Sequence, residues 1–143
     1  MFHSILCPID FSEHAERALA VATQLATEHR AHLTLLHVTD PLLEAAARAA
    51  GSADAVSSQT QAELRALFAR VAPNGSAPPM AVAVVAGAPA RQILTQATEC
   101  GADLIVMGMH GAGAAERLIM GSTTSRVLDR ARVPVLAVPP PRR

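Results

Sequence analysis

Short, nearly continuous apolar runs alternate five times along this chain with longer segments of helical periodicity. The runs span residues 3–9, 32–38, 80–86, 103–108 and 133–138. They are rich in Val, Ile and Leu and show no alternation with polar residues, which is typical of strands that are covered on both faces. The pattern therefore predicts an α/β fold, in which an open five-stranded parallel sheet carries helices on both faces and each crossover is right-handed.

The segments between the runs predict the helices. Helical spacing of apolar residues extends over 12–29, 41–50, 64–71, 89–100 and 122–131. Ser12 is expected to cap the first helix, because Glu13 and Glu16 follow it and favour the positive end of a helix dipole. Gly51 is a stop signal, and the sequence does not determine whether residues 40–57 are ordered. The length of 143 residues fits a single domain that spans residues 1–143.

Composition limits the partners that this chain is expected to have. Lys+Arg and Asp+Glu number 12 each, so no overall field favours nucleic acid or an anionic membrane. No apolar run approaches the length of about 18 residues that spans a bilayer. The N-terminal segment lacks the basic residues of a secretory signal. We expect a cytoplasmic protein in which Cys7 and Cys100 are small buried groups and form no disulfide.

In open parallel sheets the ligand site lies beyond the carboxyl ends of the strands. The loops to consider therefore follow Ile9, Val38, Ala86 and Met107. The first of them, in "CPIDFS", places the carboxylate of Asp10 at the mouth of the sheet. A structural alternative is that Asp10 only caps the following helix, and the two roles are compatible.

The stretch "GMHGAGAAERLIMGSTTS" at residues 108–125 follows the fourth predicted strand. Glycine allows positive φ and close approach to a ligand, and a helix that begins near Gly121 presents unpaired N–H groups. Hydroxyl groups at residues 122–125 add neutral donors, so the stretch suits phosphate oxygens. Two structural alternatives remain: the glycines could end the strand tightly, and the hydroxyls could act as helix caps alone.

Two familiar phosphate motifs are excluded. A Walker loop would need a lysine between Gly121 and Ser122, and a GxGxxG loop would need glycine where Glu116 stands. The pattern that does fit is GxxG, nine residues, then GS, with Gly108, Gly111, Gly121 and Ser122 in register.

With this pattern the chain resembles the universal stress protein family, specifically its ATP-binding subclass, whose signature is GxxGx9G[ST]. The resemblance extends from "ILCPIDFSEHAERAL" through "LLHV" and "ADLIVMGMHGAG" to "GSTTSRVLDRARVPVLAVP". It implies strand order 3-2-1-4-5 in a Rossmann-like sheet related to that of the adenine nucleotide alpha hydrolases. It also implies a homodimer that pairs through the last predicted strand, residues 133–138.

The resemblance also implies the residues that contact ATP. The adenine and ribose pocket would be lined by Pro8, Asp10 and the backbone of Val38. The sugar and phosphates would be followed by Met107, Gly108 and Gly111. The phosphate tail would be held by Gly121, Ser122, Thr123 and Thr124. His110 occupies a position where members often carry a basic or imidazole side chain, whereas Cys7 and Met109 depart from the residues common in the family.

Catalysis has little support in the sequence. Phosphoryl transfer needs cations at the transferred group and a residue that orients the nucleophile, and only Arg117 and Arg126 lie near the glycine stretch. We therefore expect a nucleotide-dependent stress or signalling switch with slow ATP hydrolysis at most. Mg²⁺ or Mn²⁺ would arrive with the nucleotide, held mainly by phosphate oxygens, and no protein metal site is expected. The alternatives are an ATPase or nucleotidyl-transfer enzyme on the same fold, and an interaction module that binds no nucleotide.

Overall fold

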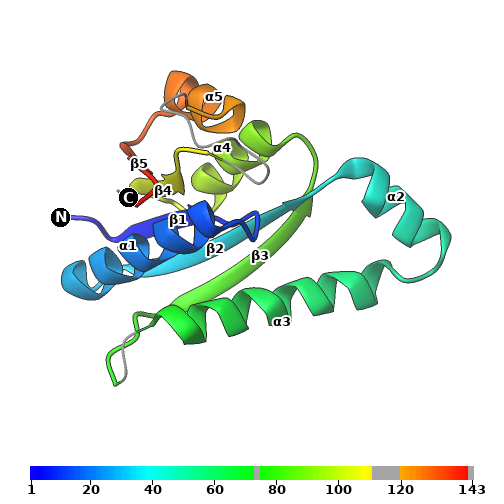
Figure 1. Cartoon of the computed structure of the whole chain (residues 1–143), viewed down its shortest axis with the longest axis horizontal. Helices are drawn as coiled ribbons and strands as arrows, with labels where there is room; N and C mark the ends of the chain where they lie inside the picture. The colour runs from blue at the N-terminus through cyan, green and yellow to red at the C-terminus, as the bar shows by residue number, and fades with distance from the viewer. Residues whose placement is uncertain (73–74, 111–119, 142–143) are drawn as a thin grey trace.

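A five-stranded, all-parallel sheet in the order β3-β2-β1-β4-β5 forms the centre of the molecule (Figure 1). The computed structural model describes residues 1–72, 75–110 and 120–141. The strands are β1 (Ser4–Pro8), β2 (His32–Thr39), β3 (Met80–Ala86), β4 (Leu104–Gly108) and β5 (Val135–Val138). The predicted fold class and strand order are confirmed.

Helices cover both faces of this sheet. The described helices are α1 (Glu13–His29), α2 (Pro41–Ala49), α3 (Ala53–Val71), α4 (Pro89–Glu99) and α5 (Ser122–Arg130), and all of them except α2 contribute residues to the two cores. One core contains Leu19 of α1 and Leu64 of α3, and the other contains Ile93 of α4 and Val127 of α5. Because side chains of a strand alternate between faces, neighbouring residues of β2 such as Leu35 and Leu36 enter different cores. The strands are apolar throughout for this reason.

The beginning of α1 follows the predicted capping chemistry. Ser12 has extended backbone angles, and its hydroxyl accepts the N–H of Ala15 at 3.2 Å. Glu13 and Glu16 lie in the first turn, where the helix dipole favours negative charge. The loop between β1 and α1 is therefore short and closely held, which positions it at the carboxyl edge of the sheet.

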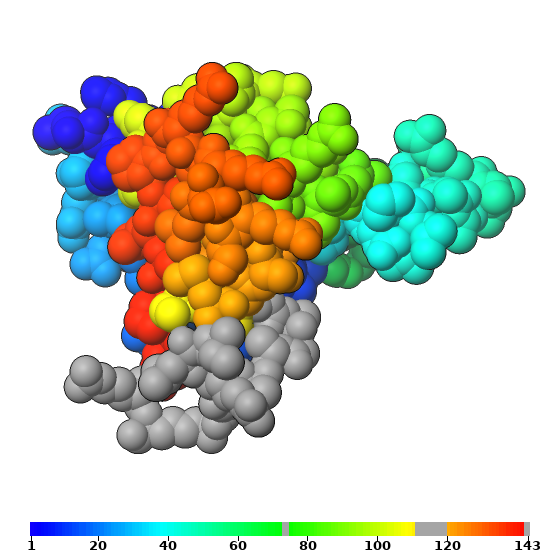
Figure 2. Space-filling view, turned by 90° about the horizontal axis from the view of Figure 1, so that it is seen from above, coloured from blue at the N-terminus to red at the C-terminus, as the bar shows by residue number. Residues whose placement is uncertain are grey.

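Residues 40–57 contain the helix α2 and the beginning of α3. Asp40 caps α2 by accepting the N–H of Leu42 at 2.7 Å, and Gly51 separates the two helices with a φ of +72°. None of the residues of α2 is buried, and the helix projects from the body of the molecule (Figures 1 and 2). Leu42 and Leu43 are largely exposed on it.

Two expectations from the sequence need correction. The last strand begins at Val135 and not at residue 133, because Pro134 has no N–H to donate to a strand ladder. Cys100 is partly exposed, whereas Cys7 is fully buried as predicted. The difference arises because Cys7 lies in a central strand and Cys100 lies at the C-terminal end of α4.

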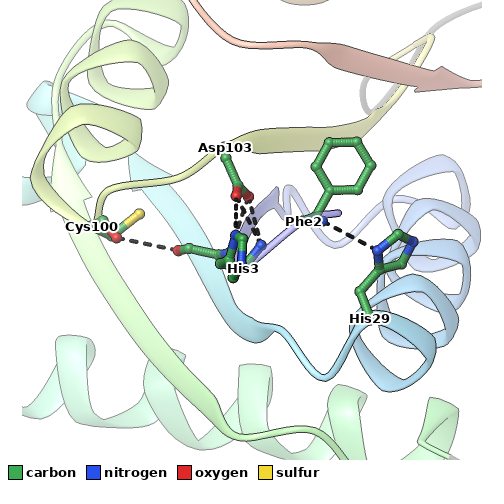
Figure 3. Close-up of polar contacts among 6 residues, drawn as sticks. Phe2, His3, His29, Cys100 and Asp103 are labelled. Atoms are coloured by element: carbon green, nitrogen blue, oxygen red, sulfur yellow. Dashed lines mark hydrogen bonds and ion pairs between the residues drawn. The ribbon is translucent and has the colours of Figure 1, made fainter.

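A polar contact at the amino ends of the strands holds the start of β1 (Figure 3). The Asp103 carboxylate accepts the N–H of His3 at 2.8 Å and the N–H of Ser4 at 3.1 Å, and it lies 3.3 Å from Nδ1 of His3. Partial burial raises the pKa of Asp103, but the hydrogen bonds from Ser4 and His3 outweigh it and lower that pKa below its usual value. This contact lies at the opposite edge of the sheet from the site described next.

Candidate functional site

A pocket of about 780 Å³ opens at the carboxyl ends of β1 and β4, the neighbours between which the strand order reverses. Its volume lies within the range of small-molecule sites, roughly 300–1,000 Å³. Several predicted site residues line it: Pro8, Asp10, Val38, Met107, Gly108, His110, Gly121, Ser122, Thr123 and Thr124. Gly111 lies outside the described residues.

Asp10 shapes the loop that forms one wall of the pocket. Its Oδ1 accepts the backbone N–H of Ser12 at 3.0 Å and also the Ser12 hydroxyl. Ser12, and not Asp10, is the residue that caps α1. Between them Phe11 adopts a φ of +62°, a conformation that is uncommon for a residue other than glycine. Asp10 therefore holds the capping residue in place from within the pocket wall.

The N-terminus of α5 forms the opposite wall, and two hydrogen bonds attach it to residues 108 and 109 at the end of β4. Thr124 Oγ1 donates to the carbonyl of Gly108 at 2.8 Å, and the N–H of Gly121 donates to Met109 at 2.7 Å. Met109 in turn donates its N–H to Val138 at 3.0 Å. The first intrahelical bond of α5 runs from the N–H of Ser125 to Gly121. The N–H groups of residues 122–124 precede it, so they have no partner within the helix and lie at its positive end.

The two described glycines of this site, Gly108 and Gly121, do not use the positive φ that glycine allows. Gly121 is the N-cap of α5, with φ of −65° and ψ of 157°. A Cβ on Gly108 would lie 3.1 Å from both Cβ and the carbonyl oxygen of His14. Gly108 therefore allows β4 to pack closely against the backbone of α1, which is a structural role.

His110 is the most unusual side chain of the pocket. It is 5% exposed, and its ring meets that of His14 at a centroid distance of 5.5 Å and an interplanar angle of 65°. Within the described part of the chain, Nε2 of His110 is buried and has no hydrogen-bond partner. A buried polar nitrogen without a partner is costly, and it marks a place where a ligand atom could complete the bonding.

Sequence reasoning missed several residues of the pocket: Ile9, Ala15, Leu36, Asp40, Pro89 and Ile93. Asp40 directly follows β2 and Pro89 begins the helix after β3, so both lie at the carboxyl edge that the fold class indicates. That position was an available signal for them. Ala15, Leu36 and Ile93 are core residues, and only the packing of helices on the sheet brings them to the pocket floor.

The pocket combines two carboxylates with one side chain that can become positive. Among the lining residues Asp10 and Asp40 are acidic, His110 can bind a proton, and no Lys or Arg is present. Within the described ranges, no group of three or more His, Cys, Asp or Glu side chains could hold a metal ion. The residues present fit an anionic ligand that is held by backbone N–H groups, neutral hydroxyls and one imidazole.

None of the helices in the described residues is both long enough and apolar enough to cross a bilayer.

The chain is similar to known proteins over nearly its full length. A protein of Thermus aquaticus, named universal stress protein in QAH/OAS sulfhydrylase 3′ region, is 37% identical over 96% of this chain and 99% of its own. The structure of MJ0577 from Methanocaldococcus jannaschii superposes with a TM-score of 0.78 at 26% identity, covering 100% of this chain and 99% of that chain.

A more distant likeness concerns the fold alone. The universal stress protein from Archaeoglobus fulgidus, solved in complex with dAMP, has a TM-score of 0.65 at 18% identity, and the match covers 96% of this chain and 97% of that chain.

The family of the chain is shown by a match to a family model. The model of the universal stress protein family matches residues 1–139. With a parallel sheet in the order 3-2-1-4-5 and a pocket at its switch point, this chain belongs to the universal stress protein family.

Proposed function

We propose that this protein binds ATP in the pocket between β1, β4 and α5 and acts as a nucleotide-dependent stress or signalling switch. The observation that carries the proposal is the meeting of the α5 N-terminus with the unpartnered, buried Nε2 of His110 in one pocket. Both features favour a phosphate group. Membership of the universal stress protein family, together with the resemblance of the glycine stretch to the signature of its ATP-binding subclass, supports an adenine nucleotide as the ligand class.

The proposed orientation follows from the chemistry of the walls. The phosphates lie at Gly121, Ser122, Thr123 and Thr124, where helix N–H groups and hydroxyls gather. The adenine and ribose lie toward Pro8, Asp10 and Val38, where apolar surface is available and a carboxylate can accept hydrogen bonds from ribose hydroxyls. Met107 and Gly108 line the pocket between these ends, and the family resemblance implies that Gly111, which lies outside the described residues, also follows the sugar and phosphates.

The same residues argue against fast catalysis. Phosphoryl transfer requires positive charge at the transferred group, and the described lining offers one imidazole and no Lys or Arg. Mg²⁺ or Mn²⁺ would be held mainly by the phosphate oxygens. We therefore propose slow hydrolysis at most, and a turnover above about one per second would instead favour an enzyme.

The proposed site is tested by calorimetric titration of the unaltered chain and two Ser122 variants. Each protein is titrated with ATP and Mg²⁺ and, in parallel, with adenosine. Ser122 is exposed at the first position of α5. A glutamate in the first turn suits the helix dipole, so we expect Ser122→Glu to fold, but it places negative charge where the phosphates are proposed to lie. Ser122→Gln is the matched neutral control.

We expect micromolar ATP binding by the unaltered chain, a loss of at least about tenfold in Ser122→Glu, and a change within about threefold in Ser122→Gln. Adenosine should bind both variants equally. Equal ATP affinity of the Glu and Gln variants would place the phosphates elsewhere. No ATP binding by the unaltered chain, shown by mass spectrometry to carry no retained nucleotide, would contradict the proposal.

We further propose a homodimer in the cytoplasm that pairs through the last strand. In the described structure β5 is an edge of the sheet, and Leu136 on it is 39% exposed. An uncovered edge offers backbone groups to a second chain. Sedimentation at micromolar concentration should show a dimer, and Leu136→Lys should shift it toward monomer. A monomeric unaltered chain would contradict this pairing.

A further inference from the structure

His110 lines the pocket with a buried ring nitrogen that has no hydrogen-bond partner among the described residues. The residue is only 5% exposed to solvent, so the unpartnered Nε2 has no water to bind from the bulk solvent. The same side chain lines the pocket together with the first residues of α5. The helix N-terminus and the unpartnered nitrogen are independent features that point to one anion.

The charges around His110 come from three elements. His14 of α1 packs edge-on against its ring, Asp10 follows β1, and Asp40 follows β2. The lining residues contributed by α4 and α5 are uncharged: Pro89, Ile93, Ser122, Thr123 and Thr124. An ATP phosphate tail would therefore enter a pocket that already holds two carboxylates, and His110 is the one described lining side chain able to supply positive charge.

We infer that His110 takes up a proton when a nucleoside phosphate binds, so that nucleotide affinity increases as the pH falls through the neutral range. The inference rests on the proposed function and adds a regulation to it. An imidazole ordinarily titrates near pH 6.5, and a nearby phosphate favours the imidazolium. The complex then holds more protons than the free protein, and linkage makes binding tighter at lower pH.

His14 supplies a matched control. It carries the same ring, lies in contact with His110, and is half-buried on α1, but it does not line the pocket. Its own protonation would oppose a charge on His110, because like charges repel at this distance. Replacing it with glutamine retains a polar side chain with the same Cβ, and the uptake of a proton at His110 should remain.

The experiment measures ATP–Mg²⁺ and adenosine binding near pH 6 and near pH 8, at one ionic strength, for the unaltered chain, His110→Gln and His14→Gln. Titrations in buffers of different ionisation enthalpy count the protons taken up on binding. We expect the unaltered chain and His14→Gln to bind ATP roughly five- to tenfold more tightly near pH 6, with net proton uptake. In His110→Gln the two ATP affinities should agree within about twofold, and adenosine should show no pH dependence in any chain.

Changes in ATP itself are present equally in all three chains, so the difference between them reports on His110. Equal pH dependence and equal proton uptake in the unaltered chain and His110→Gln would overturn the inference while leaving the proposed function intact. No ATP binding by the unaltered chain at either pH would contradict the proposed function. NMR titration of the His110 imidazole with and without ATP needs no substitution, and an unchanged protonation state on binding would also overturn the inference.

Discussion

The hydroxyl of Thr124 donates a hydrogen bond to the carbonyl oxygen of Gly108 at 2.8 Å and joins the first turn of α5 to the last residue of β4. Thr124 is 3% exposed, so this bond is shielded from water. The family resemblance implies that both residues contact the nucleotide. The structure adds a second role, because this bond holds the helix N-terminus at the end of the sheet.

Replacing Thr124 with valine should therefore weaken both folding and binding. The variant keeps the shape of the side chain but leaves the Gly108 carbonyl without its donor, and we expect a loss of about 1–3 kcal/mol in the free energy of unfolding. Urea denaturation measures this loss. Thr124→Ser retains the hydroxyl and should lose clearly less; if the two variants are equally stable, the hydrogen bond contributes little.

Gly108→Ala tests the close approach of β4 to α1. The added Cβ would lie 3.1 Å from the carbonyl oxygen of His14, and backbone inside a packed helix cannot move away easily. We expect destabilisation of about 1–3 kcal/mol from overpacking, measured by thermal or urea unfolding. Gly101→Ala is the control for strain alone, since its Cβ would meet nothing within 4 Å but φ is +64°. A Gly108→Ala variant of unchanged stability would show that α1 can shift freely.

The two cysteines should react with thiol reagents at very different rates. Burial raises the pKa of the Cys7 thiol far above its ordinary value, and the side chain is fully buried. The thiolate is the reactive form, so Cys7 should react only when the protein opens. Cys100 is partly exposed and should be modified first. Mass spectrometry of the Cys100→Ser variant checks this: rapid labelling of Cys7 in the folded protein would contradict the prediction.

Asp103 should make the stability of the amino-terminal strand depend on acid. Its pKa in the folded protein is lowered from the ordinary value of 3.8, so its contribution is present above that value and is lost as the pH falls through the folded pKa. Asp103→Asn should be less stable than the unaltered chain near neutral pH, and the difference should disappear at strongly acidic pH. Urea unfolding across that range measures the difference, and a gap that does not change with pH would exclude titration of Asp103 as its cause.

Much of this molecule follows from short-range sequence patterns. The apolar runs and helical segments predict the elements and the fold class, and Ser12 with Glu13 and Glu16 predicts the start of α1. The sequence does not determine the conformation of residues 40–57. In the structure they contain the helix α2, none of whose residues is buried, so no buried face marks this helix in the sequence. The sequence also predicts the start of α5 at Ser122, because glycine followed by hydroxyl residues is a helix-start signal that depends only on neighbouring residues.

Tertiary packing decided the chemistry of the pocket walls. Three features of the pocket depend on segments that are distant in the chain. They are the close approach of Gly108 to the backbone of His14, the burial of Nε2 of His110, and the position of Asp40 in the pocket lining. Periodicity and capping report on neighbours within one or two turns, so they predict elements but not which side chains meet. The sequence by itself determined a parallel α/β sheet with a helix that begins after the glycine stretch, whereas the packing of distant segments decided that a buried imidazole lines the same pocket as that helix start.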